Sequence, residues 1–150
     1  MSHSFTIIVH GTAPDSLAST QALRFASAVL DRGHSLYRIF FYHGGVTIAN
    51  RLQVVPEQET DAAKQWLALA RRCNVELAVC IAAAQRRGVI SSSEQQRYQK
   101  PAASAQAGFN IVGLGQMIDA AVQADLDVRP KRGAKPSSLP RLHSCCSRSA

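Results

Sequence analysis

Long apolar runs are missing from this sequence of 150 residues, and none approaches the roughly 20 residues that a membrane-spanning helix needs. The polar N-terminus, residues 1–5, also lacks the basic segment and the cleavage site of a signal peptide. Both absences favour a cytoplasmic protein without membrane contact. The length suits one domain with a sizeable hydrophobic core.

Acidic residues are absent from residues 130–150, which contain five basic residues. The formal net charge of +7 therefore leaves about +2 for the rest of the chain, so the body is close to neutral. A basic tail can contact nucleic acid non-specifically, but its serine and proline content is more typical of a solvated, disordered end. We predict a folded domain over residues 1–128, a disordered tail over residues 129–150, and no specific binding of nucleic acid.

Cysteines are few, and none is spaced as a metal ligand. No C-x-x-C pair occurs, and no histidine follows a cysteine at the spacing of a zinc finger. Disulfides are rare in a reducing cytosol. We therefore expect no metal site and four free thiols: Cys73, Cys80, Cys145 and Cys146.

Short apolar runs rich in β-branched residues alternate with segments of helical periodicity. Such alternation predicts parallel strands joined by right-handed crossovers, with helices on both faces of the sheet. The predicted fold class is α/β, a three-layer α/β/α arrangement with a mostly parallel sheet of four to five strands. Strands are predicted over residues 5–9, 36–42, 77–81, 109–112 and 126–128. Helices are predicted from a cap at Asp15 or Ser16 to Asp31, over 57–73 after Pro56, over 82–87 and over 116–124. A helical turn is predicted at 47–52, and the segment 91–100 is either helix or loop.

Cys80 lies at the carboxyl end of the third predicted strand, where open α/β sheets collect ligands and reactive groups. The backbone N–H groups of the next helical turn, at Ala82 and its neighbours, carry a partial positive charge that stabilises a thiolate. Arg86 and Arg87 follow and add to that field. Free cysteines are also commonly buried and inert. Position alone therefore leaves two hypotheses open, a reactive thiol and a core residue.

Two histidines and two glycines follow other strands. His10 and His43 lie at the same edge of the predicted sheet as Cys80, where each is either an acid–base group or an ordinary loop residue. Gly113 and Gly115 precede a helix, as in phosphate-binding turns, but the third glycine and the lysine of a P-loop are missing. A nucleotide-binding domain therefore remains an alternative, although packing of helix against strand explains these two glycines equally well.

Three stretches together resemble the DsrE/TusD family of sulfur-relay proteins. They are "FFYHGGVTIANRL" (residues 40–52), "VCIAAAQRRGV" (79–89) and "GFNIVGLGQMIDAAVQAD" (108–125), in this order along the chain. The similarity covers nearly all of residues 5–125. The middle stretch is the most specific, because it combines a cysteine, three alanines, paired arginines and a glycine after a strand.

The resemblance implies a DsrE-like fold and a small subunit of a heterohexamer, formed with TusB- and TusC-like or DsrF- and DsrH-like subunits. It also implies a sulfurtransferase without an organic cofactor. The family's strand-end cysteine, here Cys80, would accept sulfane sulfur as a persulfide, supported by Ala82, Arg86 and Arg87, with His10 and His43 as site neighbours. We expect Cys80 to be exposed at a groove, since protein partners must reach it.

Two branches of the family differ in where the sulfur goes. In the TusD branch a TusA-like donor supplies it and a TusE-like acceptor takes it on, for 2-thiolation of the tRNA wobble uridine. In the DsrE branch, with a DsrC-like acceptor, it enters dissimilatory sulfur oxidation. We favour tRNA thiolation. A non-catalytic scaffold subunit is the alternative of another class.

The chain departs from the family after residue 125, where a basic end replaces most of the hydrophobic final strand.

Overall fold

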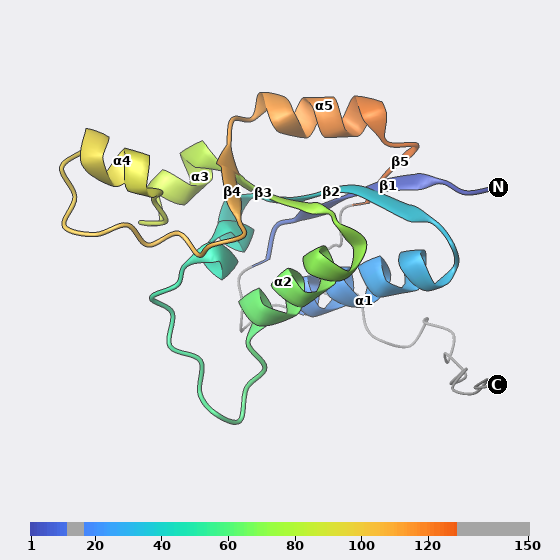
Figure 1. Cartoon of the computed structure of the whole chain (residues 1–150), viewed down its shortest axis with the longest axis horizontal. Coiled ribbons are helices and arrows are strands. Elements are labelled where there is room, and N and C mark those ends of the chain that lie inside the picture. Colours follow the sequence, from blue (N-terminus) through green and yellow to red (C-terminus); the bar gives the residue numbers. More distant parts are fainter. Residues whose placement is uncertain (12–16, 129–150) are drawn as a thin grey trace.

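The computed structural model describes residues 1–11 and 17–128 (Figure 1). The predicted tail, with Cys145 and Cys146, and the candidate caps Asp15 and Ser16 lie outside these residues. Five strands form one sheet in the order β4-β3-β2-β1-β5, and every neighbouring pair is parallel. The strands are β1 (Ser4–Val9), β2 (Ser35–Phe41), β3 (Glu76–Cys80), β4 (Asn110–Val112) and β5 (Leu126–Val128).

Helices cover both faces of the sheet, which confirms the predicted three-layer α/β architecture. Figure 1 shows α1 (Leu17–Asp31) and α2 (Ala62–Cys73) on one face and α5 (Gly115–Gln123) alone on the other. Two short helices, α3 (Ile81–Gln85) and α4 (Ser92–Arg97), extend beyond β4 at the side of the sheet. A 3₁₀ helix, η1 (His43–Ala49), follows β2.

The aromatic part of the core lies between the sheet and the layer of α1 and α2. Phe41 of β2 and Trp66 of α2 are fully buried and meet edge to face, with ring centroids 5.4 Å apart. The Trp66 Nε1–H group donates a hydrogen bond to Ser19 Oγ of α1 at 3.1 Å, so its polar atom is satisfied. Truncating such a side chain to alanine typically costs about 3–5 kcal/mol. These contacts fix both helices to the sheet.

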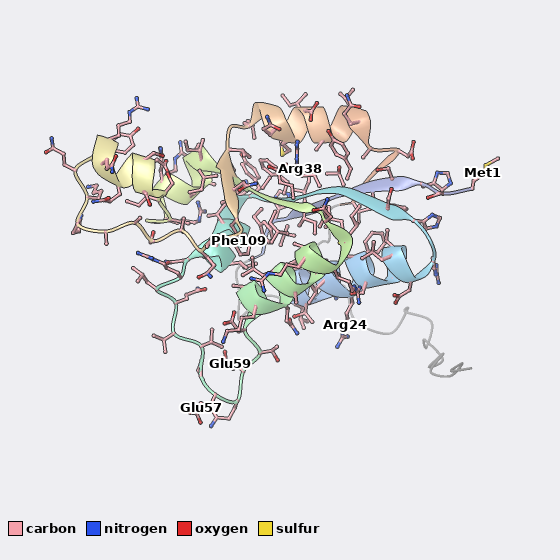
Figure 2. The ribbon with its side chains drawn as sticks, in the orientation of Figure 1. Met1, Arg24, Arg38, Glu57, Glu59 and Phe109 are labelled. Atoms are coloured by element: carbon pink, nitrogen blue, oxygen red, sulfur yellow. The ribbon has the colours of Figure 1, made fainter. Side chains whose placement is uncertain are left out.

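Arg38 of β2 attaches α5 to the opposite face of the sheet, and Figure 2 shows it between the two. Its Nε donates to Glu76 Oε2 at 2.7 Å. Its Nη1 donates to the Gln116 carbonyl at 2.9 Å and to Asp119 Oδ2 at 3.2 Å. Thr6 Oγ1 adds a hydrogen bond to the Ala120 carbonyl at 3.1 Å. The start of α5, and with it the turn after β4, is thereby held over the sheet.

The prediction that Pro56 opens the second long helix is wrong. The helix begins at Ala62, because the side chain of Asp61 caps it by accepting from the backbone N–H of Lys64 at 3.1 Å. The segment at Pro56 instead forms a turn, in which the Glu59 N–H donates to the Pro56 carbonyl at 2.9 Å. Residues 51–60 are exposed and form the long loop in Figure 1.

The other elements lie close to their predicted bounds. The helical turn predicted at 47–52 is found earlier, as η1, because it packs directly against the end of β1. The segment at 91–100 contains a true helix, α4. The short fifth strand over residues 126–128 is confirmed and pairs with β1.

Candidate functional site

Cys80 is the last residue of β3 and the N-cap of α3. It lies opposite Val112 of β4, and its backbone is extended, with φ −63° and ψ 117°. Side chains alternate along a strand, so Cys80 and Ala78 share the sheet face of Glu76, the face that carries α5. The thiol makes no capping hydrogen bond.

The expectation that Cys80 is exposed at a groove is wrong for the isolated chain. Only 1% of the residue is accessible, and it belongs to the main hydrophobic cluster. The small side chains of Ala83 and Ala84 are buried in the same cluster, which lets α3 pack closely on the sheet. Cys80 therefore has the core environment of one hypothesis and the strand-to-helix position of the other.

The first turn of α3 supplies the backbone groups nearest to Cys80. The opening N–H groups of a helix have no partner within the helix and carry partial positive charge. Ala82 is exposed there and adds no polar group of its own. Arg86 and Arg87 lie at the other end of α3, about 9 Å along a helix axis from Cys80. Both are exposed, and Arg87 Nη1 donates to the Ala83 carbonyl at 3.2 Å.

His10 and His43 do meet at the carboxyl edge of the sheet. Their ring centroids are 5.7 Å apart, and the ring of Tyr42 lies 5.6 Å from His10 and 4.4 Å from His43. Gly45 permits this arrangement: a Cβ atom there would lie 2.2 Å from the Val9 carbonyl oxygen. The sequence placed both histidines at this edge correctly, and the structure adds the tyrosine.

Cys73 lies at the other end of β3. It ends α2, and its Sγ donates to the Leu69 carbonyl at 3.0 Å, within the helix. Cys73 and Cys80 are both free thiols. Among the described residues, no group of three His, Cys, Asp or Glu side chains is placed to hold a metal ion. Of these two thiols, only Cys80 lies at the carboxyl edge of the sheet.

Glu94 is a buried acidic residue beside α3 that we did not identify from the sequence. It is 6% exposed and forms a capping box with Ser91 at the start of α4. Its Oε1 accepts a hydrogen bond from Gln85 Nε2, the last residue of α3. Ser104 attaches the segment after α4 to the segment between α3 and α4, because its Oγ donates to the Gly88 carbonyl and accepts from the Ile90 N–H. The stretch Ser91-x-x-Glu94 was the available sequence signal.

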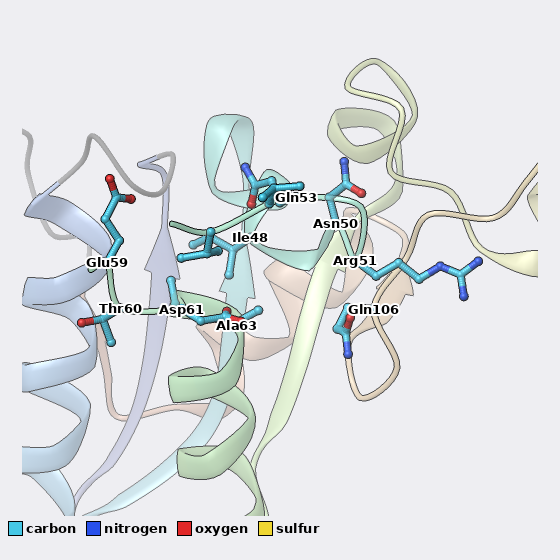
Figure 3. A pocket seen from close by; sticks show the side chains of 12 residues that line it. Ile48, Asn50, Arg51, Gln53, Glu59, Thr60, Asp61, Ala63 and Gln106 are labelled. Atoms are coloured by element: carbon cyan, nitrogen blue, oxygen red, sulfur yellow. The ribbon is translucent and has the colours of Figure 1, made fainter. Parts of the chain in front are cut away.

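A hollow of about 110 Å³ lies away from these residues (Figure 3). Ile48 of η1, Ala63 of α2 and Gln106 line it, together with the loop that joins η1 to α2. None of the predicted site residues contributes to its wall. Gly113 and Gly115, the basis of the nucleotide alternative, are exposed, and a Cβ atom on either would meet nothing within 4 Å.

The fold is a small parallel α/β domain with a cysteine at a strand-to-helix junction, which agrees with the family that the sequence motifs resemble. The DsrE/DsrF-like family matches residues 3–126, and the chain belongs to this family. The family prediction is therefore confirmed.

Relatives are similar over most of the chain. The DsrE protein of Allochromatium vinosum is 43% identical over 108 residues, which cover 72% of this chain and 83% of that protein. A sulfurtransferase TusD homolog of Aliivibrio fischeri is 42% identical over 125 residues, covering 83% and 96%. The sulfurtransferase TusD of Serratia proteamaculans is 40% identical over 121 residues, covering 81% and 94%. These similarities confirm the prediction of a sulfurtransferase.

A solved structure has the same fold. The ychN protein of E. coli superposes with a TM-score of 0.66 at 21% identity, covering 86% of this chain and 99% of that one. Within the described residues, no helix has both the length and the apolar character needed to cross a bilayer.

Proposed function

We propose that Cys80 accepts sulfane sulfur as a persulfide and passes it to a partner protein, in the relay for 2-thiolation of the tRNA wobble uridine. The observation that carries this proposal is the place of Cys80, at the carboxyl end of β3 and directly before the amide groups of α3. The TusD names of the relatives from Aliivibrio and Serratia support the tRNA branch.

The proposed chemistry is thiol–persulfide exchange in two steps. The Cys80 thiolate attacks the outer sulfur of a donor persulfide, the donor's S–S bond breaks, and the donor thiolate leaves with the electron pair. The thiolate of an acceptor protein then attacks the outer sulfur on Cys80, and Cys80 leaves as a thiolate. No net oxidation or reduction occurs. The N–H groups of the first turn of α3, including that of Ala82, would stabilise the anionic sulfur in both states.

Burial adds a requirement to this mechanism. Because only 1% of Cys80 is exposed, its sulfur atom cannot attack a donor persulfide along the axis of the donor's S–S bond. We propose that binding of a partner displaces the segments around the junction of β3 and α3 before transfer. Arg86 and Arg87 lie at the far end of α3, and His10 and His43 lie at the same carboxyl edge of the sheet.

Mass spectrometry after incubation with cysteine persulfide tests the assignment. We expect the protein to gain one sulfur atom on Cys80. The Cys80→Ser variant should not gain it, whereas the matched Cys73→Ser variant should gain it at the rate of the unaltered protein. A Cys80→Ser protein that loads sulfur at that same rate would refute the role of Cys80 and favour a scaffold subunit.

The destination of the sulfur is tested separately, because the DsrE relative favours a second candidate, transfer within dissimilatory sulfur oxidation. Loaded protein is mixed with a TusE-like or a DsrC-like acceptor, and the acceptor's mass is followed. We expect faster transfer to the TusE-like protein. Faster transfer to the DsrC-like protein would reassign the chain to the other branch.

We further propose a cytoplasmic heterohexamer, with TusB- and TusC-like or DsrF- and DsrH-like subunits and a TusA-like donor. Exposed apolar side chains support an assembly. Ile118 and Val122 of α5 are 61% and 76% exposed, and Leu52 and Val54 of the loop before α2 are 63% and 91% exposed. The domain would comprise residues 1–128, and the basic residues after it would form a separate tail.

A further inference from the structure

We propose that the surface of α3 and α4 is a docking site for an acidic protein segment, which brings a donor or acceptor thiol to Cys80. This inference rests on the proposed function of Cys80 and adds the chemistry of its partner. We call the surface the basic lobe. It consists of Arg86, Arg87, Arg97, Lys100 and the adjoining Arg51.

The distribution of charge singles out the basic lobe. Between residues 77 and 118 the sequence has four basic residues and one acidic residue, Glu94. Glu94 is buried, and Ser91 and Gln85 occupy its carboxylate. The other residues up to 128 contain seven basic and nine acidic residues. A nearly neutral domain thus concentrates its positive charge beside its reactive cysteine.

The charges of the basic lobe are available to a partner. Arg86, Arg97 and Lys100 are exposed, and none forms an ion pair with a carboxylate of the described chain. The Arg97 guanidinium lies over the Tyr98 ring, 5.4 Å from its centroid. Arg51 is held against the lobe, since its Nε and Nη2 donate to the Ala103 carbonyl at 3.1 and 2.7 Å. Unpaired surface cations of this kind attract an oppositely charged partner.

The basic lobe is connected to the cysteine through α3. Helix α3 begins directly after Cys80, and Arg86 follows its last residue, about 9 Å along the helix axis. The hydrogen bond between Gln85 and Glu94 joins α4 to the end of α3, and Figure 1 shows the two helices side by side. A partner seated on the lobe therefore places its own segment within reach of the junction of β3 and α3.

An acidic protein fits the basic lobe better than RNA does. The sulfur exchanged at Cys80 must arrive on, or leave to, another sulfur atom, which a protein cysteine supplies. Single-stranded RNA is typically held by several aromatic rings on which bases stack. The lobe has one such ring, Tyr98, and Arg97 already covers it.

Two synthetic peptides of equal length test the proposal on the full chain. Each carries one cysteine persulfide, flanked in one peptide by Asp and Glu and in the other by Ser and Gln. The Cys80 thiolate attacks the outer sulfur and the peptide thiolate leaves. Rates of sulfur arrival are measured by mass spectrometry and divided by the same protein's rate with cysteine persulfide. We expect the acidic peptide to react faster, with an advantage that falls as salt rises.

Matched variants locate the effect. The double variant Arg97→Gln and Lys100→Gln should reduce the advantage of the acidic peptide roughly three-fold, as loss of two steering charges implies. The control, Arg24→Gln and Arg71→Gln, removes two exposed cations from α1 and α2, which Figure 1 shows away from α4. It should leave the advantage unchanged. The basic residues after residue 128 are the same in all three proteins, so their contribution cancels.

Equal advantages in the two double variants would overturn the proposal. A second result would also overturn it: the variant Arg97→Gln and Lys100→Gln loses binding of a single-stranded RNA 20-mer but keeps its preference for the acidic peptide. The lobe would then be a nucleic-acid site. If neither peptide nor cysteine persulfide loads Cys80, the proposed function fails on its own. Docking is then measured by fluorescence anisotropy of the acidic peptide with serine in place of cysteine. Weaker binding only in the variant Arg97→Gln and Lys100→Gln supports docking on the basic lobe, and equal binding by both double variants refutes it.

Discussion

At the scale of the residue, Gly45 determines how the carboxyl edge of the sheet is built. Its N–H donates to the carbonyls of Tyr42 and His10, at 2.9 and 3.2 Å, which closes η1 onto the end of β1. A Cβ atom would lie 2.2 Å from the Val9 carbonyl oxygen. Real side chains do not approach backbone this closely, so the contact between His10 and His43 depends on glycine at this position.

The variant Gly45→Ala should therefore be destabilised by about 1–3 kcal/mol, the usual cost of overpacking a closed site. Gly113→Ala is the matched control, because its Cβ would meet nothing within 4 Å, and its stability should change by less than about 0.5 kcal/mol. Urea unfolding followed by circular dichroism measures both. Equal midpoints for the two variants would contradict the steric argument.

The position of Cys80 was predictable from the sequence, but its burial was not. An apolar strand followed by alanines and a glycine defines where β3 ends and α3 begins, and this is local information. Exposure depends on what packs across the strand end from elsewhere in the chain. The link of Glu94 to α3 was missed for the same reason. Its capping box can be read from the local sequence, but its hydrogen bond with Gln85 depends on how α3 and α4 pack together.

At the scale of the element, α3 is too short to be stable alone and depends on its connection to α4. Gln85 donates to Glu94, and Ser91 donates to Glu94 from its N–H at 2.9 Å and from its Oγ at 3.1 Å. The carboxylate therefore organises both helix ends at once. Loosening α4 should therefore loosen α3, the helix that follows Cys80.

The variant Glu94→Ala should lose about 1–2 kcal/mol of stability, as removal of a capping interaction and of a buried acceptor implies. It should also alkylate Cys80 faster, as measured by iodoacetamide labelling in the Cys73→Ser background. The control Glu57→Ala alters an exposed side chain of the loop before α2 and should change neither property (Figure 2). An unchanged labelling rate in Glu94→Ala would show that α4 does not support the cysteine.

Sequence periodicity predicted the strands and the long helices because their buried faces repeat regularly. It misplaced the start of α2, because Pro56 and Asp61 are both good helix-start signals and only packing selects between them. Asp61 prevails, since from Ala62 onward the helix places Trp66 and Leu69 in the core.

At the scale of the whole molecule, the three layers leave one helix face without a partner. Leu114, Ile118 and Val122 recur every four residues along α5 and are exposed, although α5 is the single helix drawn over its side of the sheet in Figure 1. Arg38 and Thr6 hold the inner side of α5. The outer side is therefore free to contact another subunit.

The double variant Ile118→Lys and Val122→Lys should fold normally but fail to assemble when co-expressed with TusB- and TusC-like subunits, because two charges would be placed in an apolar contact. Light scattering after size-exclusion chromatography measures the mass. The control Leu17→Lys changes an exposed apolar residue of α1 and should assemble as the unaltered chain does. A full-sized complex with the double variant would exclude α5 as an interface.

The near-complete enclosure of Cys80 has a consequence for the cargo it is proposed to carry. Peroxide, glutathione and other small thiols consume reactive sulfur wherever they can touch it. A residue with 1% of its surface accessible offers them almost no target while the chain is at rest. The packed side chains around Cys80 would then protect a persulfide from small molecules, and the sulfur would be released only to a protein that displaces the junction of β3 and α3.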